Sequence, residues 1–287
     1  MGAQEQVENY RSYSVLMSVY SKESPAALKQ SMKSIANQTI KSDDFILVCD
    51  GPLNDELDAV IKEMQGVLKD SLKVVHLPKN VGLGRALNEG MKYSRHNIIA
   101  RMDSDDISRP DRCEKQLKVL CDGNFDVVSG TVEEFSSNLR KVEARRVLPE
   151  RNEEIIKFAK WRNPFNHPCV MYRKDAVEAA GGYQDFYLLE DYYLWLRMLM
   201  KGSRGYNIQE PLLWMRAGKS MYKRRSGREY ARSQRKLFRY MHENGFISSG
   251  EYIISCFLRT VSAHIPNWLR QGLFNVLVRK QERWGLK

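Results

Sequence analysis

The stretch Asn97-Ile-Ile-Ala-Arg-Met-Asp-Ser-Asp-Asp106 (NIIARMDSDD) predicts a short apolar strand that runs directly into a cluster of carboxylates. Three carboxylates within four positions repel one another unless they are solvated, protonated or bridged by a cation. Hard divalent ions such as Mg²⁺ bind one or two carboxylates together with substrate phosphates. An Asp-x-Asp turn at a strand end therefore fits a metal–diphosphate site. The alternative is an acidic, solvated turn that caps the next helix.

The sequence before this stretch alternates apolar runs with helical patterns. Strand–helix alternation at this spacing predicts a mostly parallel sheet with helices on both faces, an α/β fold. Ligands of such sheets bind at the carboxyl ends of the strands. The predicted strands are Tyr13–Tyr20, Phe45–Cys49, Leu72–Leu77 and Asn97–Met102, and the predicted helices begin at Ser24–Pro25 and span Asn54–Leu68, Leu83–Tyr93 and Pro110–Leu120.

The regular alternation ends after a further apolar run at Asp126–Thr131. Beyond it the sequence predicts a helix near Glu153–Trp161, a strand near Cys169–Tyr172 and a helix over Asp191–Lys201. We therefore expect a flexible N-terminus (residues 1–12), an α/β domain (13–215, with a nucleotide-binding half over 13–131 and an acceptor half over 132–215) and a basic helical C-terminal extension (216–287).

The composition is that of an ordinary globular protein, with 43% hydrophobic and 28% charged residues among 287. The five cysteines are odd in number and scattered, which argues against a disulfide framework and against a zinc site, and for a reducing compartment. The N-terminus has no apolar run of the kind that a signal peptide needs. No stretch approaches the roughly 18 consecutive apolar residues of a membrane-spanning helix.

The positive charge is confined to the last quarter of the chain. From Arg216 onward there are 16 Lys and Arg against 4 Asp and Glu, whereas residues 1–215 carry 30 and 31. Aromatic and aliphatic residues alternate with Arg in Arg228–Met241 and Trp268–Lys280, and Trp284 follows. Basic amphipathic helices with such residues bind anionic membrane surfaces. The alternative is that these helices pack on the body and expose only their charges.

Other polar features follow the predicted strands or open a helix. Asp50 ends the second strand and either binds a nucleotide base or ribose or caps a turn. Asn80–Arg85 (NVGLGR) follows the third strand and predicts a glycine turn that allows close approach of a ligand. Gly181-Gly182-Tyr183 precedes Glu190-Asp191 at the start of an apolar helix, where acidic residues are also stabilised by the helix dipole. Tyr183 either stacks on a sugar or anchors the loop.

Taken in order, these motifs resemble the family 2 glycosyltransferases with the GT-A fold. The resemblance covers Tyr13–Gly202 and rests on motifs that occur in family order: VLMSVY, CDG, NVGLGRALNEG, RMDSDD, HPCVMYRK, GGY and LLEDYYLWLRM. It is strongest to bacterial enzymes that assemble capsule, exopolysaccharide or O-antigen repeat units. The first strand ends SVYS where many relatives have Tyr-Asn, and CDGP replaces the commoner Asp-Asp-Gly-Ser.

The resemblance implies a role for each matching residue. Asp191 would be the catalytic base, with Gly182, Tyr183 and Glu190 on the acceptor side. Asp105 would ligate Mn²⁺ or Mg²⁺, and Asp103 would share the metal or hold the ribose. The donor would contact Ser18, Tyr20, Asp50, Arg85, Asp103 and Ser104.

The function that follows is inverting, metal-dependent transfer of a hexose to a saccharide acceptor in bacterial surface polysaccharide biosynthesis. UDP-glucose or UDP-galactose is the favoured type of donor, and the acceptor would be lipid-linked. The enzyme would then work in the cytoplasm, peripherally on the inner face of the cell membrane. Two alternatives are a catalytically inactive nucleotide-sugar-binding homologue and a basic nucleic-acid-binding protein. The neutral body, which lacks nucleic-acid-reading motifs, argues against the second.

Overall fold

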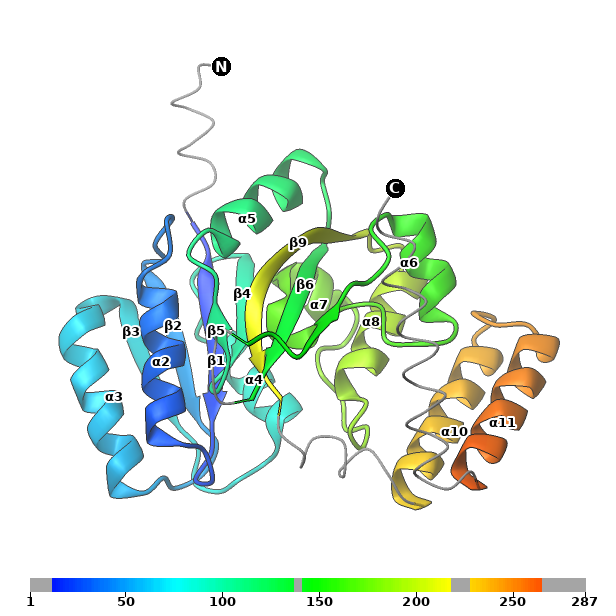
Figure 1. Ribbon diagram of the computed structural model, residues 1–287, viewed down its shortest axis with the longest axis horizontal. Coiled ribbons are helices and arrows are strands. Elements are labelled where there is room, and N and C mark those ends of the chain that lie inside the picture. Colours follow the sequence, from blue (N-terminus) through cyan, green and yellow to red (C-terminus); the bar gives the residue numbers. More distant parts are fainter. Residues whose placement is uncertain (1–11, 137–140, 218–227, 265–287) are drawn as a thin grey trace. The chain divides into compact units, whose positions relative to one another are not determined.

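The computed structural model describes residues 12–136, 141–217 and 228–264 (Figure 1). The chain divides into two compact units, residues 1–221 and 222–287. The predicted flexible N-terminus, except residue 12, lies outside the described residues, as do the second aromatic and basic stretch at Trp268–Lys280 and Trp284.

The first unit is built on one sheet, in which the four predicted N-terminal strands form a parallel block. Antiparallel strands extend this block on one side. The strand order is β3 (Leu72–His76), β2 (Asp44–Cys49), β1 (Ser14–Val19), β4 (Ile98–Asp103), β8 (Met171–Arg173), β6 (Val127–Phe135), β9 (Gly205–Arg216) and β5 (Ile107–Ser108), with β7 (Ala144–Arg146) paired to β6.

Helices cover both faces of the parallel block. Val15 and Met17 of β1 belong to a buried core that also includes residues of three helices on one face: α2 (Pro25–Ala36), α3 (Asp55–Leu68) and α5 (Arg112–Asp122). Leu16, the residue between them, points the other way and lies close to Gly90 of α4 (Leu83–Met91). Because side chains alternate along a strand, the two faces need separate helical covers. The predicted mostly parallel α/β fold is confirmed.

Local capping explains why the early helices begin where the sequence predicts. Ser24 accepts a hydrogen bond from the Ala27 amide at 3.4 Å, and Pro25 stands in the first turn of α2. Asn54 accepts one from the Leu57 amide at 2.9 Å and opens α3. Each side chain satisfies an amide that the helix itself leaves without a partner.

The second half of the unit differs more from expectation. The three helices that follow are α6 (Asn152–Ala159), α7 (Lys174–Ala179) and α8 (Glu190–Met200). The 12-residue strand β9 was not predicted, because GYNIQEPLLWMR has no clean alternation and contains Pro211. β9 nevertheless pairs in parallel with β6, and the register shifts twice near Gly130 and Thr131. Strand β9 brings Arg216 back to the sheet, so this residue lies in the first unit rather than at the start of an extension.

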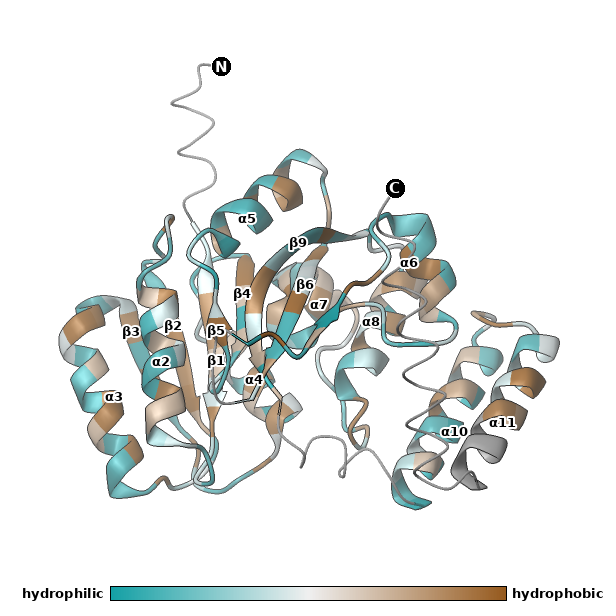
Figure 2. Ribbon diagram, in the orientation of Figure 1, coloured by the Kyte–Doolittle hydropathy of each residue, from teal (hydrophilic) through white to brown (hydrophobic). Residues whose placement is uncertain are grey.

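In the second unit the described residues form two helices, α10 (Arg228–Glu243) and α11 (Ser249–His264). The helix predicted over Arg228–Met241 is therefore present, with Leu237, Phe238 and Met241 buried. None of the helices among the described residues combines the length and the hydropathy needed to span a bilayer. Hydrophobic positions of both helices are coloured brown in Figure 2.

Candidate active site

The carboxyl ends of the parallel strands bring the predicted site residues to one edge of the sheet. Ser18 on β1 is paired in register with Val48 on β2 and with Asp103 on β4. Asp50 follows β2 directly. The sheet topology therefore places Ser18, Asp50 and Asp103 at the edge where α/β proteins bind their ligands.

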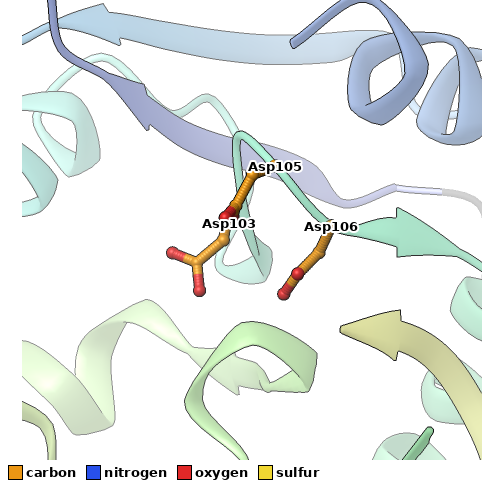
Figure 3. Close-up of side chains that lie close together, drawn as sticks. All are labelled: Asp103, Asp105 and Asp106. Carbon is orange, nitrogen blue, oxygen red and sulfur yellow. The ribbon is translucent and has the colours of Figure 1, made fainter. Parts of the chain in front are cut away.

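The carboxylate turn, which we define as Asp103, Asp105 and Asp106, is the most concentrated charge at this edge. One oxygen from each of the three residues lies within 4.8 Å of the others. Figure 3 shows the carboxylates of Asp103 and Asp106 pointing to the same side of the turn. Asp106 is buried, and the other two are half-buried. The spacing suits shared coordination of one cation.

The electrostatics of the carboxylate turn favour a bound cation. Burial raises the pKa of Asp105 to about 7, and the charges of Asp103 and Glu23 add to the shift. Burial also raises the pKa of Asp106, with Asp103 and Asp105 contributing next. Crowded, desolvated carboxylates resist ionisation until a positive charge joins them.

Two arginines from different strands already offset part of this negative charge. Arg101, buried on β4, forms an ion pair with Asp103. Arg216 of β9 donates its backbone amide to Asp106 Oδ1 at 2.7 Å and its Nε to the Asp105 carbonyl at 3.1 Å. Within the described part of the chain, Asp106 Oδ2 is buried and has no hydrogen-bond partner. A buried carboxylate oxygen without a partner is costly, and a metal ion would satisfy it.

Ser104 and Glu23 form a polar contact beside the carboxylate turn. Ser104 is buried and donates its hydroxyl to Glu23 Oε2 at 3.0 Å. In this arrangement its hydroxyl orients Glu23. The donor-binding role of Ser104 stays a prediction.

Asp50 holds the glycine turn that follows β3. Its carboxylate accepts the amide of Val81 at 2.7 Å and the amide of Gly82 at 3.1 Å. Gly82 has a φ of +89°, a conformation that residues with a side chain rarely adopt. Of the two roles expected for Asp50, the structure shows the turn-stabilising one, and the base-binding one stays a prediction.

Arg85 and Tyr20 are the exposed members of the predicted donor set. Tyr20 is 38% exposed. Arg85 is exposed on α4 and forms an ion pair with Asp185, with Nε to Oδ1 at 3.0 Å. Hydrogen bonding to Asp185 and its charge raise the pKa of Arg85. Because both side chains of this pair are exposed, another anion can replace the Asp185 carboxylate at Arg85.

The GGY turn (Gly181–Tyr183) is held by two buried or half-buried polar side chains. Arg197 of α8 donates to the carbonyls of Ala180 and Gly182, the latter at 2.7 Å. Asn88 of α4 accepts the Tyr183 amide at 2.8 Å and donates to the Tyr183 carbonyl at 2.7 Å. Gly182 has a φ of +63°, and a Cβ there would meet Asn88 Oδ1 at 2.8 Å, so glycine is required.

Tyr183 is only 3% exposed, and its hydroxyl lies 2.9 Å from His167 Nε2. Burial raises the pKa of this phenol well above its usual value. Of the two roles expected for Tyr183, its packing favours the loop anchor over a ring that stacks on a sugar. Its place on the acceptor side stays a prediction.

The start of α8 carries the predicted base. Asp191 is half-buried, and its Oδ2 accepts Asn163 Nδ2 at 2.7 Å. Its Oδ1 accepts the Tyr192 amide, also at 2.7 Å. Glu190 lies against α4, because a Cβ built on Gly84 would be 3.7 Å from the Cβ of Glu190 and 3.3 Å from the Cβ of Tyr183. The glycine turn and the start of α8 are thus in contact.

A family model for glycosyl transferase family 2 matches residues 14–181, more than half of the chain. The chain belongs to glycosyl transferase family 2. It is a glycosyltransferase, as its sequence motifs predict. The matched segment contains the carboxylate turn, the glycine turn and Arg85, and it ends at Gly181 in the GGY turn, so it does not include Asp191.

Curated relatives of this glycosyltransferase match over nearly its whole length. An amylovoran biosynthesis glycosyltransferase of Erwinia amylovora is 40% identical over 91% of this chain and 97% of its own. A UDP-Gal:α-D-GlcNAc-diphosphoundecaprenol β-1,3-galactosyltransferase of Escherichia coli is 38% identical over 93% of this chain and 97% of its own. The predicted resemblance to polysaccharide-assembling enzymes is confirmed.

Solved structures confirm the GT-A fold of the glycosyltransferase. S. aureus TarS 1–349, in complex with UDP-GlcNAc, aligns with a TM-score of 0.66 and 16% identity over 95% of this chain and 77% of that one. The mannosyltransferase PcManGT from Pyrobaculum calidifontis, in complex with GDP-Man and Mn²⁺, aligns with a TM-score of 0.61 and 16% identity over 90% and 70%.

The structure adds five residues that the sequence did not assign to the site: Glu23, Arg101, Asp106, Asn163 and Arg216. Arg101 and Asp106 both lie in the RMDSDD motif. Because side chains alternate along a strand, Arg101 and Asp103 were predictable as neighbours on the same face of β4. No sequence pattern pointed to Arg216 or Asn163, because they reach the site from β9 and from a loop that is distant in sequence.

Proposed function

We propose that this glycosyltransferase transfers a hexose from a UDP-sugar, with Mn²⁺ or Mg²⁺ and inversion of the anomeric carbon, to a lipid-linked saccharide acceptor in bacterial surface polysaccharide biosynthesis. The observation that carries the proposal is the carboxylate turn. It combines three clustered carboxylates with one buried oxygen that lacks a partner among the described residues. The relatives support the substrate classes, since one is named for UDP-galactose and a diphosphoundecaprenol acceptor.

The donor would bind along the carboxyl edge of the sheet. Asp105, Asp103 and Asp106 would hold the metal, which when bound supplies Lewis-acid stabilisation of the diphosphate leaving group. Ser18 and Tyr20 would contact the base. Asp50 would position the glycine turn or contact the base. Arg85 would bind the diphosphate after its ion pair with Asp185 breaks. Ser104 would support the carboxylate turn through Glu23.

Asp191 would act on the acceptor side. Its carboxylate would take the proton of the acceptor hydroxyl as that oxygen attacks the anomeric carbon. Sugar transfer passes through an oxocarbenium-like transition state, and one carboxylate opposite the leaving group implies a single displacement with inversion. Glu190 and the GGY turn, including Gly182 and Tyr183, would shape the acceptor side of the site.

The direct test is a panel of nucleotide sugars assayed for release of free nucleotide with a lipid-linked N-acetylhexosamine acceptor, with Mn²⁺, with Mg²⁺ and with EDTA. We expect turnover with a UDP-hexose that requires the metal and a product of inverted configuration. Tight UDP binding without turnover by any sugar would instead indicate a nucleotide-sugar-binding homologue that is inactive. Full turnover in EDTA would reject the metal.

A lipid-linked acceptor calls for attachment to the inner face of the cell membrane, and the second unit supports this part of the proposal. On α11 the side chains of Ile253, Ile254, Phe257 and Leu258 are 50–66% exposed. On α10, Arg228, Arg232, Arg235 and Arg239 are exposed. Exposed apolar surface together with basic charge fits an anionic bilayer surface.

Sedimentation with vesicles tests the membrane attachment on the full chain. Each Arg near an anionic surface contributes about 1 kcal/mol and is screened by salt. The triple variant Arg232→Gln, Arg235→Gln, Arg239→Gln should therefore bind phosphatidylglycerol vesicles more weakly than wild type, and high salt should weaken wild type likewise. Equal binding to neutral and anionic vesicles would contradict an electrostatic attachment.

A further inference from the structure

We propose that Asn163 is a positioning residue that orients the carboxylate of Asp191 for proton abstraction; this inference rests on the proposed role of Asp191 as the base. Asn163 lies in the loop between α6 and the short helix His167–Cys169. Its Nδ2 donates to Asp191 Oδ2 at 2.7 Å, within the range of strong hydrogen bonds to a charged acceptor.

The loop that carries Asn163 is fixed to the sheet on both sides of the residue. Asn166 donates to the carbonyl of Gly130 on β6 at 2.9 Å. Asn207 on β9 donates to the carbonyl of Pro164 at 3.0 Å. Both asparagines are buried. Asn163 is therefore presented from a rigid platform rather than from a free loop, as accurate positioning requires.

Helix α8 is fixed to the same platform. The ring of Phe165 packs edge-on against Trp195 with ring centres 5.6 Å apart. The Tyr192 hydroxyl donates to the carbonyl of Ala159 in α6 at 2.6 Å. The Asn163–Asp191 contact is thus held between two segments whose spacing is set by independent contacts.

The orientation of the Asn163 amide agrees with a donor role. Its Oδ1 accepts the Phe165 amide at 3.4 Å, which leaves Nδ2 for Asp191. Asp191 Oδ1 accepts the Tyr192 amide at 2.7 Å, so each carboxylate oxygen has a donor. The terminal torsion of an aspartate is otherwise broad. The two hydrogen bonds therefore fix the plane in which the Asp191 carboxylate lies.

An amide suits this role better than a charged partner. It donates a hydrogen bond that favours the ionised carboxylate, yet it carries no full positive charge that would strongly weaken the base. The arrangement follows the general pattern in which a base is oriented by a third group. Half-burial of both residues keeps Asp191 open to an acceptor.

The test compares Asn163→Ala and Asn163→Asp with wild type and with Arg162→Ala, a matched change at the exposed neighbouring position. Loss of one hydrogen bond to a charged group is worth about 10- to 100-fold. We expect kcat of Asn163→Ala to fall by that factor while KM for the donor stays within about twofold. Asn163→Asp keeps the shape but removes the donor, and its kcat should fall at least as far. Arg162→Ala should retain wild-type kcat and KM.

A double-mutant cycle separates this inference from the proposed function. If Asn163 acts through Asp191, adding Asn163→Ala to Asp191→Asn should not lower the residual rate further. A kcat of Asn163→Ala within twofold of wild type, while Asp191→Asn is strongly impaired, would overturn the positioning role alone. Full additivity of the two substitutions would also overturn the positioning role, because Asn163 would then affect kcat independently of Asp191. If Asp191→Asn is highly active, Asp191 is not the base, and the inference about Asn163 fails together with that assignment. Thermal unfolding shows whether each variant is folded.

Discussion

The carboxylate turn and the start of α8 are both acidic, but they are built in opposite ways. In the turn, three carboxylates lie within four sequence positions and are crowded and partly desolvated, and burial raises the pKa of Asp105 to about 7. At the start of α8, Asp191 is half-buried, and each of its oxygens accepts a hydrogen bond from Asn163 or from its own helix. The first arrangement favours a cation, and the second stabilises a carboxylate that can accept a proton.

Negative charge alone therefore does not define the role of an acidic region. A cluster of carboxylates whose negative charge is only partly balanced by neighbouring arginines is suited to bind a metal ion together with phosphate. A single carboxylate oriented by hydrogen bonds, as Asp191 is by Asn163 and the Tyr192 amide, is suited to general-base chemistry. We expect the two regions to be separable, with the carboxylate turn governing the donor and the start of α8 governing the acceptor.

The largest effect on the donor side should come from disrupting the metal site. Asp105→Ala, or EDTA added to wild type, should lower turnover by about a thousandfold or more, because Lewis-acid stabilisation of a leaving group is worth several kcal/mol. Asp70→Ala, which removes an exposed carboxylate remote in sequence, serves as the control and should be unchanged. Nucleotide release measured over a Mn²⁺ titration checks the prediction. An active Asp105→Ala enzyme would show that the carboxylate turn is not a metal site.

A smaller effect should follow from releasing the glycine turn. Asp50→Ala removes two hydrogen bonds from backbone amides to a carboxylate and should weaken UDP binding by about 10- to 100-fold. Asp50→Asn keeps one acceptor oxygen, so its affinity for UDP should lie between those of wild type and Asp50→Ala. Calorimetry with UDP gives the affinities.

Hydrogen exchange distinguishes the two roles of Asp50. If it holds the turn, the amides of Val81 and Gly82 should exchange faster in nucleotide-free Asp50→Ala than in wild type. Unchanged exchange combined with weakened UDP binding would instead support a direct contact with the base.

The smallest donor-side effect should come from Arg85. Its ion pair with Asp185 is exposed and screened by salt, so breaking it has little cost. Arg85→Ala should lower affinity for UDP by several-fold but leave affinity for uridine unchanged. Asp185→Ala should leave UDP affinity equal or slightly higher, because it frees the guanidinium. If both variants weaken UDP and uridine alike, Arg85 supports the loop rather than the diphosphate.

Much of the N-terminal half could be predicted from sequence, because its signals are local. Apolar runs, the Ser24 and Asn54 caps and the carboxylates after β4 lie within a few residues of the structure they specify. The parallel order of the strands then brings Ser18 and Asp103 together without further information.

The second half could be predicted less well, because its structure depends on contacts between distant segments. Strand β9 is interrupted by polar residues and Pro211, and pairing with β6 rather than its own pattern makes it a strand. The partner of Asp191 is 28 residues away in a loop, and Arg216 reaches Asp106 across 110 residues. The periodicity of a short stretch of sequence does not predict contacts between residues so far apart.

The mechanism depends on Asp191 as the base, and the variant Asp191→Asn probes that role. Asn preserves size and can still begin a helix, but it cannot accept the proton. We expect kcat to fall by about two to four orders of magnitude, the usual worth of a general base, while UDP affinity stays nearly unchanged. Glu190→Gln should be milder, because adjacent residues in a helix point in different directions. A well-folded Asp191→Asn enzyme with kcat within a few-fold of wild type would contradict the account and leave Asp191 as a helix-start residue only.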